Sequence, residues 1–333
     1  MQQRTLGTTG PAVSVLGLGA MGMSDLYGPA DEAESTATIH AALDAGITLI
    51  DTADFYGSGH NEMLIRDALR DRNRADVVLS VKFGSRKGPD GAFQAAPTDT
   101  DPIAVKDRLA YTLRRLGTDH VDIYRPTRLN PNVPVEDTVG AIAELVQAGY
   151  VRHIGLSEVG AETLRKAAAV APISDLQIEY SLLSRGIEAE ILPTARELGI
   201  GITAYGVLSR GLLSGHWNSD RELSTGDFRG FSPRFQGENL KANLRLVDAL
   251  RKVADLLGAT VAQVAIAWVA SRGDDIVPLV GARRRDRLAE SVAAATVVLG
   301  ETDLAAIEAA IPAGAASGER YASRFMAQLD SER

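Results

Sequence analysis

Eight short apolar runs punctuate this chain, and stretches of helical length separate them, which constrains the fold more than any other feature of the sequence. Apolar runs of this length are typical of buried strands, and strands that alternate with helices imply parallel neighbours. Eight such strands are the number that closes a (β/α)8 barrel. The predicted strands are residues 13–19, 47–52, 77–83, 121–126, 153–157, 176–180, 201–206 and 276–281, and the predicted helices are residues 32–45, 61–70, 106–116, 135–147, 161–171, 188–198, 239–257, 260–271 and 285–295.

Segments outside this alternation refine the prediction. A β-hairpin that turns at residues 8–10 is expected before the barrel. Residues 84–102, residues 207–238 and the tail from residue 312 are too long and too rich in Gly, Pro and Arg to be simple connections. The first two follow strands, so in a barrel they rise on the carboxyl-end face as pocket walls or a lid, or else they are surface insertions. No Pro/Gly/Ser-rich linker interrupts the alternation, so residues 1–333 are predicted to form a single domain.

An open, doubly wound sheet is the alternative architecture. It would carry a Gly-rich dinucleotide-binding sequence between a strand and a helix. Residues 17–22, GLGAMG, match the pattern G-x-G-x-x-G after a predicted strand. The residues that follow, 23–30, have the composition of a loop and do not open a helix, so the barrel is favoured.

Three reactive side chains lie at or just past the ends of predicted strands: Asp51, Tyr56 and Lys82. A free tyrosine has a pKa of about 10, and a nearby ammonium group lowers that pKa by stabilising the phenolate. Lys82 could supply this charge, and the Asp51 carboxylate would keep the lysine ionised and oriented. Such a relay can protonate a carbonyl oxygen as the oxygen gains negative charge. Taken alone, a tyrosine at such a position usually packs, a lysine is usually solvated, and an aspartate often caps a turn.

Composition excludes several classes of function. A net charge of −8 gives no general attraction to nucleic acid or anionic lipid. No run approaches the roughly 18 apolar residues of a membrane span, and the first 22 residues lack the features of an export signal. The chain has no cysteine, which suits a cytoplasmic protein. Its 5 histidines are scattered without metal-ligand spacing, so no metal is predicted.

Seven segments, in order and over essentially the whole chain, resemble the aldo-keto reductases. They are GLGAMGMS, DTADFYGSGHNE, SVKFG, GLSEVGAETL, QIEYSLL, YGVLSRGLLSG and VPLVGARRRDRLAES. The resemblance implies a (β/α)8 barrel that binds NADP(H) across its carboxyl-end face and moves a hydride between the nicotinamide and the carbonyl of a small aldehyde or ketone.

The same resemblance assigns roles by position. It makes Asp51, Tyr56 and Lys82 three of four catalytic residues, with Tyr56 as the acid for reduction and the base for oxidation. It implies that Ser157 and Gln177 hold the carboxamide, that Tyr205 stacks on the nicotinamide, and that residues 206–212 wrap the pyrophosphate. The predicted cofactor site comprises Gly19, Met21, Asp51, Ser157, Gln177, Tyr205, Gly206, Leu208, Arg210, Leu212, Gly281, Arg283, Arg287, Glu290 and Ser291.

Arginines cluster where the last predicted helix begins: Arg283, Arg284, Arg285 and Arg287. Guanidinium groups and helix amino termini both bind phosphate, whereas cations at this end oppose the helix dipole unless an anion is bound. By resemblance, Arg283 and Arg287 contact the 2′-phosphate and the adenine, so NADP is predicted over NAD. Glu290 matches an adenine-edge contact, and Ser291 stands where the family usually has asparagine. A solvated basic surface is the alternative interpretation.

The fourth catalytic position departs from the family, because Thr127 stands where a histidine is usual. A threonine donates one weak hydrogen bond and cannot carry charge or relay a proton as an imidazole does. Arg125 or Arg128 could stabilise an oxyanion instead, or could form structural ion pairs. His60 is expected to be a loop residue, and His153 falls at the start of a strand, away from the catalytic face.

Two functions therefore stay open. The chain resembles pyridoxal reductases, which also lack this histidine, and that resemblance implies a working reductase. It also resembles channel β subunits, which implies an NADP(H)-binding sensor or regulatory subunit with little turnover. An alanine stripe on the helices fits barrel packing and a subunit interface equally well. The predicted pocket walls are Met21, Asp25, Phe55, Tyr56, Phe83, residues 125–129 and the loop after Tyr205.

Overall fold

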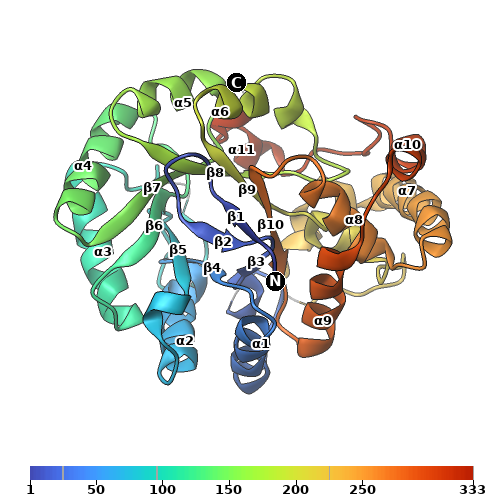
Figure 1. Cartoon of the computed structure of the whole chain (residues 1–333), viewed down its shortest axis with the longest axis horizontal. Helices are drawn as coiled ribbons and strands as arrows, with labels where there is room; N and C mark the ends of the chain where they lie inside the picture. The colour runs from blue at the N-terminus through green and yellow to red at the C-terminus, as the bar shows by residue number, and fades with distance from the viewer. Residues whose placement is uncertain (25, 95–96, 225, 333) are drawn as a thin grey trace.

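Eight parallel strands close into a barrel at the centre of the molecule (Figure 1). A computed structural model describes residues 1–24, 26–94, 97–224 and 226–332. The order around the barrel is β10-β3-β4-β5-β6-β7-β8-β9. These strands are β3 (Gly17–Gly19), β4 (Leu49–Ala53), β5 (Val78–Phe83), β6 (Val121–Pro126), β7 (Val151–Ser157), β8 (Ile173–Glu179), β9 (Gly201–Tyr205) and β10 (Ile276–Gly281). The predicted (β/α)8 barrel is confirmed.

Helices surround the barrel (Figure 1). They are α1 (Glu32–Asp44), α2 (His60–Leu69), α3 (Pro102–Leu116), α4 (Val135–Gln147), α5 (Ala161–Ala168), α6 (Ile191–Glu197), α7 (Gly237–Leu256), α8 (Val261–Ala270), α9 (Arg285–Ala293), α10 (Glu301–Ala310) and α11 (Ser323–Met326). The first nine correspond to the predicted helices, with ends that differ by a few residues. The sequence did not predict α10 and α11.

The start of α3 shows why such ends are missed. The helix begins at Pro102 rather than at residue 106, because the Asp101 side chain accepts hydrogen bonds from the backbone N–H groups of Ile103 and Ala104, both at 3.1 Å. Proline is well suited to the first turn, where its missing N–H is not needed. In the sequence this proline belongs to a Gly- and Pro-rich stretch, whose composition predicts a loop.

An antiparallel hairpin closes the amino-terminal end of the barrel. It pairs β1 (Gln3–Thr5) with β2 (Ala12–Ser14), as predicted. The single strand predicted over residues 13–19 is wrong, because residues 12–14 belong to the hairpin and only residues 17–19 enter the barrel. The Ser14 hydroxyl donates to the carbonyl of Leu16 at 2.6 Å, between the two pieces. Apolar side chains of the hairpin and of the barrel strands are buried together in one cluster: Leu6, Val13, Leu49, Ile123, Val277 and Leu279.

Three long segments gather at the carboxyl-end face of the barrel. The predicted long loops follow β5 and β9, and therefore rise on that face. The tail also lies there, since the Gly160 N–H after β7 donates to the Asp330 carboxylate at 2.8 Å. The sequence did not predict that the tail would reach this face.

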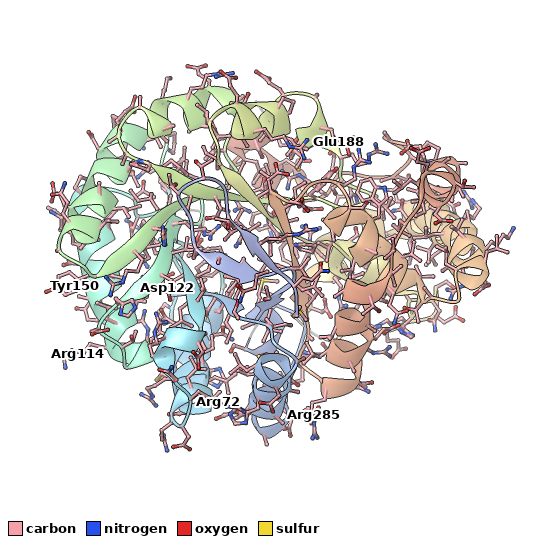
Figure 2. The ribbon with its side chains drawn as sticks, viewed as in Figure 1. Arg72, Arg114, Asp122, Tyr150, Glu188 and Arg285 are labelled. Atoms are coloured by element: carbon pink, nitrogen blue, oxygen red, sulfur yellow. The ribbon has the colours of Figure 1, made fainter. Side chains whose placement is uncertain are left out.

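The outer surface of the helices is charged. Arg72, Arg114 and Arg285 are exposed, and Figure 2 shows them at the periphery of the molecule. Among the described residues, no single helix is both long and apolar enough to span a bilayer, although α7 and α8 together, bent by 87°, pass that test by length and composition.

Candidate active site

The structure brings Asp51, Lys82 and Tyr56 together at the carboxyl-end face. Asp51 lies on β4 and Lys82 on the neighbouring β5, where Ala53 is the register partner of Lys82. The Lys82 ammonium group forms an ion pair with the Asp51 carboxylate and also donates to the Thr52 carbonyl at 3.1 Å. Tyr56 begins the turn that follows β4, and its ring centroid lies 5.0 Å from the Lys82 Nζ atom.

Burial controls the ionisation of this trio. It raises the pKa of Tyr56 well above the usual value, and the nearby Asp51 carboxylate raises it further. Burial also lowers the pKa of Lys82, against the opposing effect of Asp51. The lowered Tyr56 pKa expected from Lys82 is therefore wrong for this structure, because burial and the Asp51 carboxylate raise that pKa. At neutral pH the Tyr56 hydroxyl is protonated, as a proton donor must be.

Two further side chains hold Asp51. The Ser80 hydroxyl donates to its Oδ2 atom at 2.9 Å, and the Gln177 amide donates to the same atom at 2.7 Å. Gln177 lies on β8, in register with the buried Ser157 on β7. These two residues were predicted to hold a carboxamide; here the Gln177 amide is engaged with Asp51.

Thr127 lies at the end of β6 but does not replace an imidazole. Its hydroxyl donates to the Phe83 carbonyl at 2.9 Å, so its single proton is already used. Of the two possibilities predicted for Arg125, the ion pair is confirmed: the side chain is fully buried and contacts Asp175 at 2.8 Å. Arg128 is half-buried and donates to the Thr127 carbonyl at 2.6 Å.

A cavity of about 560 Å³ lies beside Arg128. The loops after β5 and β6, the start of α4, part of α5 and the tail surround it, and its lining includes Thr98, Leu129, Pro134 and Gln328. This cavity adjoins the loop that begins with Thr127, but its lining does not include Asp51, Tyr56 or Lys82.

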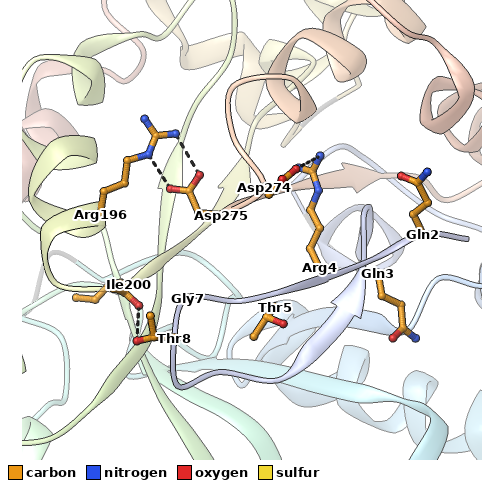
Figure 3. A pocket seen from close by; sticks show the side chains of 11 residues that line it. Gln2, Gln3, Arg4, Thr5, Gly7, Thr8, Arg196, Ile200, Asp274 and Asp275 are labelled. Carbon is orange, nitrogen blue, oxygen red and sulfur yellow. Dashed lines mark hydrogen bonds and ion pairs between the residues drawn. The ribbon is translucent and has the colours of Figure 1, made fainter.

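A second cavity, of about 590 Å³, lies at the opposite end of the barrel (Figure 3). Residues of the hairpin line it, together with residues that directly precede β9 and β10. Its charged side chains are paired: Arg196 binds Asp275 at 2.8 Å, and Arg4 lies 3.6 Å from Asp274. Amino ends of strands lie far from the carboxyl ends where barrel enzymes carry their active sites, so this cavity is not the candidate site.

The loop after β9 has an unusual backbone. Gly206, Ser209, Arg210 and Gly211 all have φ values in the left-handed region, between 46° and 101°. Within this turn the N–H groups of Ser209 and Gly211 donate to the carbonyls of Gly206, at 2.6 Å, and Leu208, at 2.8 Å. The Ser209 hydroxyl is buried and has no hydrogen-bond partner among the described residues. This loop contains the residues predicted to wrap a pyrophosphate, including the buried Leu212 and the half-buried Leu208.

Glu158, which follows β7, connects this face to the tail and was not predicted. Its φ is 54°, a strained backbone value for a residue other than glycine. Its carboxylate accepts from the Tyr205 hydroxyl at 2.6 Å and from Arg320 at 2.9 Å. The Tyr205 and Tyr321 hydroxyls lie 2.8 Å apart. Only the tertiary structure reveals this cluster, since the tail carries no motif that indicates a position near β7.

The arginines at the start of α9 have different environments. Arg283 is half-buried and donates to the Gly28 and Pro29 carbonyls, both at 3.0 Å. Arg284 and Arg285 are exposed and paired with Asp286 and Glu34. The side chains of Arg287 and His216 both contact Glu290, whereas the Ser291 hydroxyl donates to the Arg287 carbonyl at 3.0 Å.

Burial and neighbouring arginines lower the pKa of Arg283, with Arg229 the first of these neighbours. Burial likewise lowers the pKa of Arg221, with Arg229 again and Arg287 contributing. Arg221 and Arg229 belong to the long loop after β9, so this loop and α9 concentrate positive charge between them.

The remaining predicted residues lie around the barrel mouth. Gly19 and Gly281 are register partners at the ends of β3 and β10. Met21 packs against a cluster that contains Phe55 and Tyr56. Asp25, predicted as a pocket wall, lies outside the described residues. Among those that are described, no three His, Asp or Glu side chains are grouped as metal ligands.

The two histidines considered as catalytic candidates lie elsewhere. His60 begins α2, and its Nδ1 atom lies 2.9 Å from the Ser24 hydroxyl. His153 is near the start of β7, as expected, and burial lowers its pKa. The prediction that His60 is a loop residue is wrong, because His60 is the first residue of α2.

Comparisons with known proteins agree with the fold and show the family. The model of the aldo/keto reductase family matches residues 15–312. A probable aldo-keto reductase from Glycine max is 39% identical over 324 residues, which cover 96% of this chain and 92% of that protein. The structure of glycerol dehydrogenase AKR11B4 from Gluconobacter oxydans superposes with a TM-score of 0.83 at 29% identity, over 92% of this chain and 94% of that one. The chain therefore belongs to the aldo-keto reductase family.

Proposed function

We propose that this chain is an NADPH-dependent reductase that converts the carbonyl group of a small aldehyde or ketone into an alcohol. The observation that carries the proposal is the buried Asp51–Lys82 ion pair beneath the Tyr56 ring, at the carboxyl end of the barrel. Membership of the family supports the reaction class, because aldo-keto reductases use a nicotinamide cofactor.

In the proposed reaction, the hydride comes from NADPH when that cofactor is bound. The Tyr56 hydroxyl donates its proton to the carbonyl oxygen as negative charge develops there. Its raised pKa keeps this proton in place at neutral pH. Lys82, held by Asp51, directs positive charge toward the same region, and the buried surroundings strengthen its effect. In the oxidative direction, Tyr56 takes the proton back.

The residues present fit NADP. The unpartnered Ser209 hydroxyl, in the turn that follows β9, suits a pyrophosphate oxygen. Burial first, and then repulsion from neighbouring arginines, lower the pKa of Arg221 in the β9 loop and of Arg283 before α9, which indicates positive charge that nearby carboxylates do not fully compensate. An adenosine 2′-phosphate would supply the missing negative charge, so NADP is proposed over NAD.

Replacing Arg283 with methionine tests this cofactor preference. Loss of a hydrogen bond to a charged group costs about 1.5–3 kcal/mol, so the dissociation constant for NADPH should rise about 10- to 100-fold while that for NADH hardly changes. Fluorescence titration with each coenzyme measures both constants. Arg284→Met is the matched control, because this exposed neighbour is paired with Asp286. An equal loss for both coenzymes would show that Arg283 does not read the 2′-phosphate.

A sensor or regulatory subunit with little turnover is the second candidate. The observation that favours it is the Thr127 hydroxyl, which donates to the Phe83 carbonyl and leaves the usual imidazole without a substitute. Steady-state oxidation of NADPH with a panel of small aldehydes and ketones separates the two functions. Turnover supports the reductase, whereas tight NADPH binding without turnover supports the sensor. A cytoplasmic location, a single domain and a small carbonyl partner stay predictions of the sequence.

A further inference from the structure

A chain of polar side chains crosses the interior of the barrel below the proposed catalytic residues. Arg125 on β6 is fully buried, and its Nη1 atom donates to the Asp175 carboxylate on β8 at 2.8 Å. Its Nη2 atom donates to the Ser80 hydroxyl on β5 at 2.9 Å. Ser80 in turn donates to Asp51 at 2.9 Å. The buried cation is thus one hydrogen-bonded residue away from the carboxylate that holds Lys82.

The space around Arg125 is matched to its shape. A Cβ atom added at Gly155 on β7 would lie 3.1 Å from the Arg125 Cζ atom and 2.8 Å from the Asp175 Oδ1 atom. Any side chain there would displace the ion pair. Thr203 on β9 donates to the Asp175 Oδ2 atom, so β9 also contributes a hydrogen bond to the ion pair. The Arg125 Nε atom has no partner among the described residues.

A buried ion pair is weak evidence for stability, because desolvation of both charges cancels much of their attraction. Apolar residues of similar volume would fill a barrel interior at least as well. Stability alone therefore does not explain a buried cation at this position. The connection of Arg125 to Asp51 through Ser80 indicates a role in the site.

We propose that Arg125, paired with Asp175, is a positioning residue that acts through Ser80 to hold the Asp51 carboxylate and, through Asp51, the Lys82 ammonium group. The proposal rests on the proposed reductase function. The role of Arg125 is to orient Ser80. Because Arg125 donates to the Ser80 oxygen, the hydroxyl proton of Ser80 points to Asp51. Asp51 then keeps a fixed orientation toward Lys82.

The charges around Lys82 set the direction of a second effect. Asp51 raises the pKa of Lys82, while Arg125 and Arg128 lower it. Asp175 faces Arg125 from β8, and His153 lies two residues before Gly155 on β7. Removing the Arg125 charge by itself should therefore raise the pKa of Lys82, whereas loosening Asp51 by removing the Ser80 hydroxyl should lower it.

The test compares two ways of breaking this connection. The double variant Arg125→Met/Asp175→Leu removes both charges at nearly constant volume, and so leaves no unpaired buried charge. Ser80→Ala removes only the link and keeps the ion pair, so it carries the test if the double variant does not fold. The pH dependence of the Lys82 ammonium signal, read by ¹⁵N NMR of labelled lysine and assigned with Lys82→Arg, gives a readout besides turnover.

Both variants are expected to lower kcat about 10- to 100-fold, with thermal unfolding midpoints near that of the wild type. The NMR titration of Ser80→Ala should show a lowered pKa for Lys82, because Asp51 is held less firmly there while the Arg125 charge stays. Combining the double variant with Ser80→Ala should cost little more than either alone, because both act through one connection. Arg74→Met is the control: it breaks the ion pair with Asp122 at the other end of β6 and should leave kcat and the Lys82 titration unchanged.

Wild-type kcat in either Ser80→Ala or a folded double variant would overturn the proposal, as would an unchanged Lys82 titration in Ser80→Ala. Failure of the proposed function looks different: the wild type itself would then show no turnover that depends on Tyr56. The NMR titration still decides whether Ser80 is coupled to Lys82 in that case.

Discussion

Replacing Tyr56 with phenylalanine is expected to lower kcat for carbonyl reduction by about 10²–10⁴-fold, the usual contribution of a general acid. The substitution removes the proton donor and keeps the ring that lies 5.0 Å from the Lys82 Nζ atom. NADPH should therefore bind with an unchanged dissociation constant. Single-turnover measurement of NADPH oxidation, together with equilibrium titration of the coenzyme, separates the two effects.

Tyr124→Phe is the matched control for this experiment. Tyr124 is also a fully buried tyrosine, but its hydroxyl donates to the Val105 carbonyl at 3.2 Å, and its ring stacks on Phe83 away from the trio. It should lose about 1 kcal/mol of stability with its hydrogen bond and keep its kcat. If Tyr56→Phe retained wild-type kcat, the protonation step would have to be assigned to another group.

Replacing Arg320 with methionine is expected to lower the free energy of unfolding by about 3–5 kcal/mol, because it leaves the Glu158 carboxylate buried without its cation. Arg320 binds both oxygens of Glu158, and Glu158 is only 1% exposed. Urea denaturation measures the loss. Arg324→Met, in the same tail, removes a contact with the Phe325 ring and should cost less than about 1 kcal/mol.

Acid should show the same interaction. The Arg320 guanidinium lowers the pKa of Glu158 to about 2 in the folded chain, whereas the unfolded pKa is about 4.3. A lowered folded pKa means that the stabilisation is complete above the unfolded value and is lost as the pH falls toward 2. The wild type should therefore lose stability over this range, and Arg320→Met should lose less. Parallel pH profiles for the two proteins would contradict the assignment.

The barrel could be predicted from the sequence because its strands are short, mostly apolar runs. A run such as that of β5, buried over its last five residues, has one stable environment, a sheet covered on both faces. The hairpin strand was misassigned for the same reason, since residues 12–14 and 17–19 are both apolar and only their partners distinguish them. The helix α10 was missed, and its buried face is a single isoleucine, Ile307.

The candidate site divides in a similar way. The positions of Asp51, Tyr56 and Lys82 follow from strand ends that point to one face, so their grouping was predictable. The partners were not: Gln177 on Asp51, the Thr127 hydroxyl on Phe83 and Arg320 on Glu158 join residues from 44 to 162 positions apart. No local pattern specifies such contacts.

By itself, then, the sequence determined the alternation of strands and helices, the eightfold closure and the face on which the reactive groups gather, because periodicity and strand polarity are local properties. The tertiary structure alone decided the protonation state of Tyr56, the burial of Arg125 beneath Asp51 and the return of the tail to β7. These depend on desolvation and on hydrogen bonds between distant strands, and both arise only when the barrel has closed.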